Sequence, residues 1–278
     1  MNMIDKFRIN VFKKASLCRN FENEVYEKIE QKVIQIPVYL SAGQEYIPAT
    51  ISEICKDKSP LIFAQHRCHS TYLSFGGDIN ALIDELLGRK TGCAYGMGGS
   101  ASVHSKDINM YGHDGLMGSQ IPIATGACYS SRKPTIGIMG DASAEEDYVL
   151  GALGWASTKN LPILFVVEDN NLSILTEKKV RRNWEMDNVA KAFGIPAYNI
   201  SDDPIEIFEH GDRFFKNPML LNINTHRLYW HAGAGIDWKD QQDRYKIEME
   251  SLGDQAREID EHTKNKVKLA WQRQLEKQ

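Results

Sequence analysis

Two uninterrupted apolar runs in the middle of the chain predict neighbouring strands that are buried on both faces. The first run covers residues 135–139 and the second covers residues 163–167. Runs of this kind are typical of parallel strands covered by helices, whereas a half-exposed strand alternates apolar and polar residues. We expect the segment between them, residues 145–158, to be a helix. The order of strand, helix and strand indicates an α/β unit.

Further elements of the same class are expected on either side of this unit. Short strands are expected at residues 61–64 and at residues 219–224. Apolar residues recur at helical spacing over residues 79–87, with Asp78 placed to cap the helix and Gly88 placed to end it. The chain is therefore predicted to have an α/β fold with a mostly parallel sheet flanked by helices.

The other segments are less regular. Residues 21–33 are expected to form a helix, and Ser41 is expected to cap another one. Residues 91–118 contain seven glycines, and an irregular stretch of that length is commonly functional. We expect it to be an ordered loop at the active site. A second glycine-containing loop is expected at residues 226–238.

The length of 278 residues favours one large domain. Residues 1–20 are expected to be an N-terminal arm, and residues 21–238 are expected to form the α/β domain. Residues 239–278 are highly charged and are expected to be a helical segment of that same domain. Hydrophobic residues make up 42% of the chain, which is enough for a sizeable core.

Composition and charge exclude several classes of function. The formal net charge is −4, with 33 basic and 37 acidic residues, and this balance gives no electrostatic basis for binding nucleic acid. Five cysteines are scattered without a CxxC pair, which predicts reduced thiols and a cytoplasmic protein. No apolar run approaches the roughly 20 residues that span a bilayer. The first residues lack the plan of a signal peptide, so no membrane association is expected.

The candidate chemistry begins where the two central strands are predicted to end. Asp141 follows the first strand and Asn170 follows the second, 29 residues later. Open α/β sheets bind ligands at the carboxyl ends of their strands. A carboxylate and an amide oxygen suit Mg²⁺ that is bound together with a phosphate group. The alternative is that Asp141 only caps a helix, but the position of Asn170 favours the metal site.

The two segments resemble the thiamine diphosphate motif, in which GDG is followed after about 25–30 residues by a pair of asparagines. Residues 65–69, 91–100 and 115–122 resemble further segments of one family in the same order. The chain is similar to the alpha subunit of the decarboxylating first component of 2-oxo acid dehydrogenase complexes, of the pyruvate, acetoin and branched-chain type. The resemblance covers roughly residues 20 to 235.

The resemblance implies a thiamine diphosphate-binding fold, specifically the domain that grips the diphosphate. It implies Mg²⁺ held by Asp141, by the Asn170 side chain and by the backbone carbonyl of Leu172. The residues that it places at the cofactor are His66, Arg67, Leu116, Met117, Gly140, Asp141, Ala142, Ser143, Asn170, Leu172 and His231. Arginine suits such a site because its guanidinium can clamp phosphate oxygens through two parallel hydrogen bonds.

Two histidines are the candidates for catalysis. His231 lies in the second glycine-containing loop, where the family has a histidine that contacts the phosphate or the reaction intermediate. His69 is the second candidate, since it lies in the segment that also carries His66 and Arg67. A histidine with a pKa near neutrality can donate a hydrogen bond or shuttle a proton.

The sequence departs from the family pattern at several positions. Ala142 stands where the family usually has glycine, and His66 stands where it usually has tyrosine. Glu145 and Glu146 follow the metal aspartate, where the family often has amides. The two carboxylates would lie near the anionic diphosphate.

The resemblance also implies a partner. Thiamine diphosphate is held between two α/β domains in its enzymes, and a chain of this length has room for one of them. The glutamate that activates the cofactor belongs to the beta subunit in this family, so an α₂β₂ heterotetramer acting on a small 2-oxo acid is expected. A lipoyl acyltransferase would be the acceptor of the acyl group.

Two alternatives stay open. The same half-enzyme could be a carboligase that joins a two-carbon unit to an aldehyde, a ketone or a sugar. The chain could also be a paralogue that binds the cofactor and the partner but only regulates.

Overall fold

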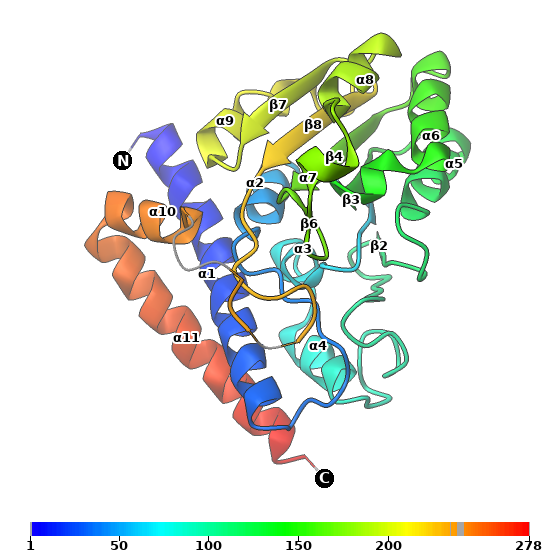
Figure 1. The fold of residues 1–278 in the computed structure, drawn as a ribbon. Helices are drawn as coiled ribbons and strands as arrows, with labels where there is room; N and C mark the ends of the chain where they lie inside the picture. Colours follow the sequence, from blue (N-terminus) through cyan, green and yellow to red (C-terminus); the bar gives the residue numbers. More distant parts are fainter. Residues whose placement is uncertain (1, 234, 238–241, 278) are drawn as a thin grey trace.

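A parallel sheet of six strands forms the centre of the protein (Figure 1). The computed structural model describes residues 2–233, 235–237 and 242–277. The strand order is β2-β1-β3-β4-β8-β7, and all neighbouring strands in this sheet run parallel. The strands are β1 (Leu61–Phe63), β2 (Met110–Tyr111), β3 (Thr135–Gly140), β4 (Ile163–Asp169), β7 (Ala197–Ser201) and β8 (Met219–Asn224), and a separate hairpin contains β5 (Leu172–Ser173) and β6 (Thr176–Glu177). The expected α/β class with a mostly parallel sheet is confirmed.

The central strand β4 is buried on both faces, as its apolar run predicts. Leu164 and Val166 belong to the hydrophobic cluster on one face of the sheet. Phe165 and Val167 belong to the cluster on the other face. Because successive side chains of a strand point to opposite faces, an unbroken apolar run fills both layers at once.

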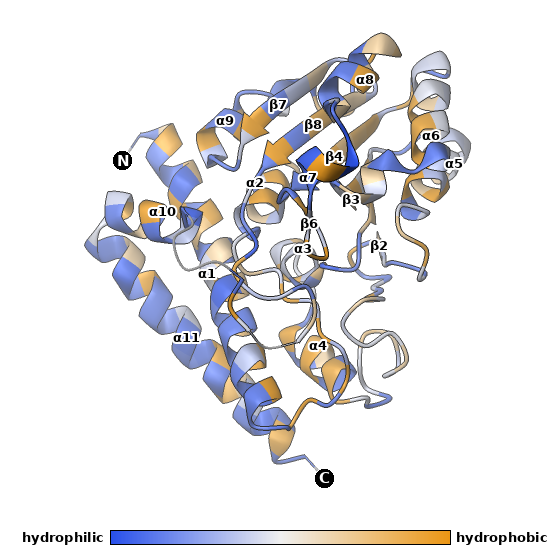
Figure 2. Ribbon diagram, viewed as in Figure 1, coloured by the Kyte–Doolittle hydropathy of each residue, from blue (hydrophilic) through white to orange (hydrophobic). Residues whose placement is uncertain are grey.

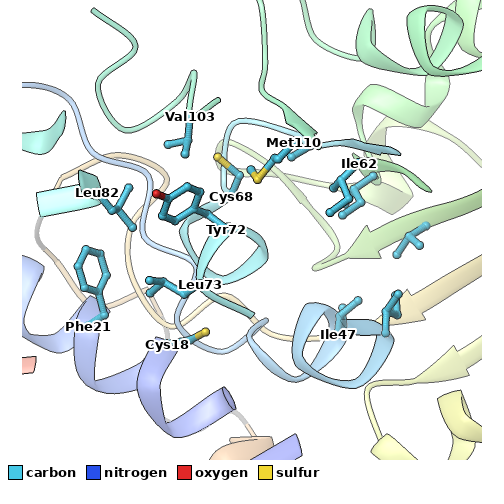
Figure 3. Packing of buried hydrophobic residues seen from close by; sticks show 14 of the residues in the cluster. Cys18, Phe21, Ile47, Ile62, Cys68, Tyr72, Leu73, Leu82, Val103 and Met110 are labelled. Atoms are coloured by element: carbon cyan, nitrogen blue, oxygen red, sulfur yellow. The ribbon is translucent and has the colours of Figure 1, made fainter. Parts of the chain in front are cut away.

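Helices cover both faces of this sheet. Side chains of α1 (Met3–Glu30), α2 (Tyr46–Ile54), α3 (His69–Ser74), α4 (Ile79–Leu86), α9 (Pro204–Phe208) and α11 (Asp254–Leu275) join the first cluster. Side chains of α5 (Gln120–Ser131), α6 (Asp147–Thr158) and α8 (Met186–Ala192) join the second. The short elements are α7 (Lys178–Arg181), α10 (Arg244–Leu252) and the 3₁₀ turns Ser143–Glu145 and Gly211–Arg213. Figure 3 shows how Phe21, Tyr72 and Leu82 pack together in the first cluster.

The first helix is much longer than the sequence pattern predicts. The helix expected at residues 21–33 begins at Met3 and ends at Glu30, and residues 3–20, expected as an arm, form its first turns. Phe12 and Ala15 are buried there in a cluster with Tyr46 and Tyr245. Residues 3–20 therefore belong to a long helix that packs against the body of the protein, rather than to a separate arm.

Two helix starts also differ from expectation. Helix α2 begins at Tyr46, and Ser41 is not its cap, because the Ser41 backbone and hydroxyl both bond to the Glu22 carboxylate. The helix expected at residues 145–158 begins only at Asp147. Glu146 has an extended backbone with ψ of 138°, so a separate 3₁₀ turn follows the strand before α6 starts.

The C-terminal segment is helical, as its composition predicts. Helix α11 lies beside α1 along one edge of the molecule (Figure 1). Figure 2 shows that most of the α11 ribbon is coloured as hydrophilic, while Trp271 of this helix is buried in the first cluster. The expected boundary between residues 238 and 239 lies outside the described residues, as does Ala234 of the second glycine-containing loop. Within the described ranges, no helix is both long and apolar enough to cross a membrane.

Candidate functional site

A pocket of about 420 Å³ lies where β1, β3 and β4 end. Strands β3 and β4 pair in register up to Gly140 and Glu168, so the residues that follow them meet at one edge of the sheet. The pocket is lined by Gln65, His66, Arg67, Met117, Gly140, Asp141, Ala142, Ser143, Glu145, Glu146, Asn170, Leu172, Ser173, Ile174, Arg181, Arg227 and His231. Most of the residues predicted for the site are therefore brought together. The exceptions are His69 and Leu116.

Asp141 lines this pocket and is 1% exposed. Burial raises the pKa of its carboxyl to about 6, the neighbouring Asp169 adds to the rise, and Arg181 opposes it. The guanidinium of Arg181 donates to the Asp141 carboxylate. The Nη1 of Arg182 donates to the Asp141 backbone oxygen at 3.0 Å. A buried carboxylate that needs a cation in this way is suited to bind a metal ion.

The side chain of Asn170 is fixed at the same edge. Its Nδ2 donates to Oε1 of Gln44 at 2.9 Å, and its Oδ1 accepts from the backbone N–H of Leu172 at 3.1 Å. Between these two residues, Asn171 has a φ of 65°, a left-handed conformation that asparagine tolerates. This turn bends the chain so that Asn170 and Leu172 both line the pocket.

No cluster of three or more His, Cys, Asp or Glu side chains suited to a metal ion occurs among the described residues. A metal at this site would therefore combine the Asp141 carboxylate with neutral oxygens, namely the Asn170 amide and a backbone carbonyl. Mg²⁺ accepts such a set when phosphate oxygens and water complete its octahedral shell. The donor set present thus fits Mg²⁺ that is bound together with a phosphate.

Two buried arginines, Arg67 and Arg227, also line the pocket. Arg67 is 3% exposed and donates through Nη1 to the carbonyl of Leu40 at 2.7 Å and through Nη2 to the carbonyl of His231 at 3.2 Å. Burial and the charge of Arg227 lower the pKa of Arg67 to about 10. Arg227 forms an ion pair with Asp237 and donates to the carbonyl of Ile174 at 2.9 Å. Two buried guanidinium groups in one pocket favour a multiply charged anion such as a diphosphate.

Three histidines lie close together near Arg67. The ring of His66 lies 5.5 Å from that of His231 and 5.9 Å from that of His113, and Tyr39 contacts both His66 and His231 edge to face. Burial and the charge of Arg67 lower the pKa of His66 to about 2 and that of His231 to about 4. Both imidazoles are therefore neutral at pH 7. Nε2 of His66 is buried without a hydrogen-bond partner in the described part of the chain, so it is available to a ligand.

His69 is not part of this pocket, contrary to its prediction as a catalytic residue. It is fully buried, with Nδ1 at 3.2 Å from the Glu22 carboxylate and Nε2 at 2.9 Å from the Ser100 hydroxyl. The backbone N–H of Tyr39 donates to the same hydroxyl at 2.9 Å. His69 therefore ties α1 to the glycine-rich loop of residues 91–118 and supports Tyr39, which contacts the two pocket histidines.

Two neighbouring residues that were both predicted to lie at the cofactor, Leu116 and Met117, differ in their position. Met117 lines the pocket, and its carbonyl accepts from the Tyr148 hydroxyl. Leu116 is 59% exposed and lies outside the pocket lining, and its N–H donates to the Asp114 carboxylate at 3.1 Å. Of these two residues, only Met117 lines the pocket in the described structure.

The departures from the family pattern are accommodated by local contacts. Ala142 has φ −74° and ψ −41°, ordinary values that do not require glycine. The Ser143 hydroxyl accepts from the Gly140 N–H at 3.0 Å and closes the turn after β3. The Glu145 carboxylate forms ion pairs with Arg181 and with Arg182. The negative charge that Glu145 brings near the pocket is thus offset by two arginines.

Sequence reasoning assigned no role to several lining residues. Gln65 and Ile174 lie within two residues of predicted positions, and Arg227 lies in the same loop as His231, so proximity along the chain could have indicated them. Arg181 offered no such signal. It lies 40 residues after Asp141, in a basic run that resembles a solvated surface.

Comparison with known proteins points to one family. The family model for the dehydrogenase E1 component matches residues 13–268. The chain is 26% identical over 239 residues to the mitochondrial pyruvate dehydrogenase E1 component subunit alpha-1 of Oryza sativa subsp. japonica, a match that covers 81% of this chain. It is 27% identical over 239 residues to the pyruvate dehydrogenase E1 component subunit alpha of Rickettsia typhi, covering 81% of this chain and 72% of that protein.

A third relative, the mitochondrial pyruvate dehydrogenase E1 component subunit alpha of Chaetomium thermophilum, is 32% identical over 228 residues. That match covers 78% of this chain and 54% of the relative. The match to the rice protein likewise covers only 60% of its length. This chain thus spans little more than half the length of the Oryza and Chaetomium relatives.

Proposed function

Because this chain belongs to the dehydrogenase E1 component family, we propose that it is the alpha subunit of a 2-oxo acid decarboxylating dehydrogenase. It depends in this proposal on thiamine diphosphate and Mg²⁺. The observation that carries the proposal is the pocket that Asp141 and Asn170 line together with two buried arginines, Arg67 and Arg227. Oxygen ligands for a metal and donors for phosphate oxygens converge there at the carboxyl edge of a parallel sheet.

Different residues of the pocket are proposed to bind the metal ion and the diphosphate. Asp141, the Asn170 amide oxygen and the Leu172 carbonyl are the proposed ligands of Mg²⁺. Arg67 and His231 are the proposed donors to the diphosphate, and the turn formed by Gly140, Ala142 and Ser143 lets the backbone approach it. His66, with its unpartnered Nε2, is a further proposed donor. Met117 and Leu116 are proposed to contact the rest of the cofactor, with Met117 the better placed.

His231 is the proposed catalytic residue of this chain. Its neutral ring can donate to, or accept from, a group at the pocket mouth. Arg67 fixes its position, because Nη2 bonds the His231 carbonyl and lies 3.5 Å from Nδ1. His69 acts in this proposal through Tyr39 and not on the substrate. Thiamine diphosphate, when bound, supplies the electron sink that makes loss of CO₂ from a 2-oxo acid possible.

A beta subunit is part of the proposal. The carboxylates that line the pocket in the described structure, Asp141, Glu145 and Glu146, all follow β3 at the metal end. The glutamate that activates the cofactor would therefore come from the other chain of an α₂β₂ heterotetramer. The relatives are named as alpha subunits, which supports this division.

The substrate proposed is a small 2-oxo acid, since the relatives are named for pyruvate. A lipoyl acyltransferase is the proposed acceptor. A cytoplasmic location is proposed because all five cysteines are free and four of them are buried. Nothing in the pocket favours nucleic acid or a membrane as a ligand.

The proposal is tested by purifying the chain alone and together with a candidate beta subunit. Release of CO₂ from pyruvate and from branched 2-oxo acids is measured with Mg²⁺ and thiamine diphosphate present. We expect turnover only with both chains, and reduction of an added lipoyl domain as the acceptor. Full activity of the chain alone, or a pair that turns over none of these acids, would contradict the proposal. A carbon–carbon bond formed with an added aldehyde, without transfer to the lipoyl domain, would assign the chain to the carboligases.

A further inference from the structure

Arg181 joins the two carboxylates that border the metal end of the pocket. One arm of its guanidinium, Nη2, donates to the Asp141 carboxylate, and the other, Nη1, donates to Glu145. The side chain is 13% exposed and lines the pocket. Arg181 comes from α7, so the chain that follows Asn170 returns to contact the residue proposed to share a metal with Asn170.

A second arginine fixes the element from which Arg181 projects. Nη1 of Arg182 donates to the Asp141 backbone oxygen at 3.0 Å and lies 3.4 Å from the Glu145 carboxylate. Its guanidinium also stacks on the ring of Trp184 at 4.7 Å. The Arg182 side chain is 1% exposed. Arg182 therefore anchors the end of α7 to β3, and Arg181 is the arginine whose head reaches the pocket.

The need for a cation here follows from the local charges. Asp169 lies beside Asp141 on the neighbouring strand and is neutralised by Lys178 at 2.7 Å. Asp141 and Glu145 have Arg181 as their shared partner in the described structure. Carboxylates this close together repel one another when they are ionised and buried, unless a cation lies between them.

We infer that Arg181 is a built-in counter-cation that competes with the metal ion for Asp141 and so sets the metal concentration at which the cofactor is retained. The inference rests on the proposed function, because it needs Asp141 to be a metal ligand. Mg²⁺ requires near-ideal octahedral geometry and a carboxylate oxygen that faces it. Arg181 already holds one oxygen of the Asp141 carboxylate, so a metal ion bound to Asp141 would share its negative charge with this guanidinium, which Glu145 keeps at the pocket wall.

Arg181 is thus a positioning residue and not a metal ligand. Its removal leaves Asp141 without the competing cation, so metal binding tightens. Removal of a metal ligand would weaken metal binding. Removal of an ordinary structural residue would weaken it or leave it unchanged. The sign of the change therefore separates the inference from both.

The test uses the chain purified with its beta subunit, thiamine diphosphate at a fixed concentration, and Mn²⁺ in place of Mg²⁺. Free Mn²⁺ is read by electron paramagnetic resonance, so that no turnover is needed. In Arg181→Gln we expect the half-saturating Mn²⁺ concentration to fall by roughly five- to tenfold, the range expected when a competing, partly buried ion pair is removed. In Arg181→Lys, which keeps the charge but cannot bridge two carboxylates in the same way, we expect a smaller fall.

Lys179→Gln is the matched control. Lys179 lies on the same short helix, its side chain is 76% exposed, and it pairs only with Glu177 among the described residues. This variant removes the same charge without touching Asp141. A half-saturating concentration that is unchanged or higher in Arg181→Gln, or that falls equally in Lys179→Gln, would overturn the inference. Arg181→Lys tests it alone if Arg181→Gln does not fold.

The outcome for the proposed function is read separately in the same experiment. If the wild type binds no Mn²⁺ with thiamine diphosphate, or if Asp141→Ala binds it as tightly, the proposed function fails and the inference fails with it. If binding depends on Asp141 but not on Arg181, only the inference is overturned.

Discussion

The amide of Asn170 donates to the side-chain oxygen of Gln44 at 2.9 Å. Gln44 is 2% exposed and its own amide nitrogen lies 3.4 Å from the Glu168 carboxylate. This arrangement fixes which end of the Asn170 side chain is nitrogen and leaves its oxygen on the side of Leu172, whose N–H it accepts at 3.1 Å. Gln44 therefore decides whether Asn170 offers an oxygen to a metal.

Substitution of Gln44 tests this relationship. In Gln44→Met, Asn170 loses the acceptor that orients it, and its amide can rotate to present nitrogen to the pocket. We expect the affinity for thiamine diphosphate with Mg²⁺ to fall by about tenfold, which corresponds to one lost hydrogen bond of about 1.4 kcal/mol. The measurement is equilibrium binding of the cofactor. Gln35→Met, at an exposed position, is the control, and equal affinities in the two variants would contradict the role of Gln44.

The glycine-rich loop depends on one buried carboxylate. Glu85 is fully buried, and its two oxygens accept the backbone N–H groups of Ala94, Gly96, Gly98 and Gly99 at 2.7–3.0 Å. Glu85→Gln turns an amide N–H₂ toward these donors, so we expect a loss of unfolding free energy of about 2–3 kcal/mol. Hydrogen exchange should accelerate at residues 94–99.

The control for this variant is Glu258→Gln on the exposed face of α11. Its unfolding free energy and its amide exchange in residues 94–99 should match those of the wild type. Unchanged exchange in Glu85→Gln would show that the loop keeps its conformation without the carboxylate.

Substitution of His69 should reduce stability, whereas substitution of His231 should reduce cofactor binding. His69→Ala removes the partner of Glu22 and Ser100 in the interior, and we expect it to cost about 2–3 kcal/mol of unfolding free energy. At a temperature well below its melting point, it should bind the cofactor within about threefold of the wild type, since His69 lies outside the pocket. His231→Ala should show the reverse, with little loss of stability and weaker binding. Equal losses of binding in both variants would place His69 at the cofactor after all.

The pH dependence of the unfolding free energy should reveal the lowered pKa of His66. Its pKa in the folded protein is lowered to about 2 by burial and by Arg67, below the ordinary value of 6.5. Below pH 6.5 the unfolded chain therefore takes up a proton that the folded protein does not. The contribution of His66 to stability is fully present above pH 6.5, and it is lost as the pH falls, by at most about 1.4 kcal/mol per pH unit.

A variant is needed to isolate this effect, because Glu168 acts in the opposite direction. Burial raises the pKa of Glu168 to about 7, so its contribution to stability increases as the pH falls from 7 toward 4.5. We expect the unfolding free energy of the wild type, relative to that of His66→Phe, to fall by about 1–2 kcal/mol between pH 7 and pH 5. Denaturant unfolding at several pH values measures it, and parallel profiles for the two proteins would contradict the lowered pKa.

The parts of the fold that the sequence predicted are those with a local cause. The apolar runs of β3 and β4 are buried on both faces, and Asp78 caps α4 by accepting from the Asn80 N–H at 3.0 Å. The family was also recognised from segments whose residues follow directly after strands. That recognition is confirmed by the match over residues 13–268.

The first helix could not be predicted over its full length because its buried face is partly polar. Arg19 is 6% exposed and is neutralised by Glu45 and Asp243, while Asn20 donates to Asp260 at 2.7 Å. These partners lie 26 to 240 residues away along the chain. A search for an apolar stripe treats such positions as exposed, so the helix was expected to begin only at Phe21.

The same distinction between local causes and contacts distant along the chain applies to the candidate site. Residues next to a strand end, such as Asp141, Asn170 and Leu172, could be placed because the chain direction fixes them. His69 and Arg181 could not, since the orientation of a side chain at the start of α3 and the return of α7 depend on tertiary packing. The roles of all these residues in binding and catalysis stay predictions.

The most direct test of the central claim is calorimetric titration of thiamine diphosphate with Mg²⁺ into the chain co-purified with its beta subunit. Asp141→Ala removes the proposed metal carboxylate, and Asp147→Ala removes an exposed carboxylate six residues later as the control. We expect saturable binding in the wild type and in Asp147→Ala, and a loss of affinity of at least about 100-fold in Asp141→Ala, because losing a residue that only supports a metal ligand already costs about 10- to 100-fold. Equal affinities in Asp141→Ala and the wild type would contradict the assignment of this pocket to a metal-bound diphosphate.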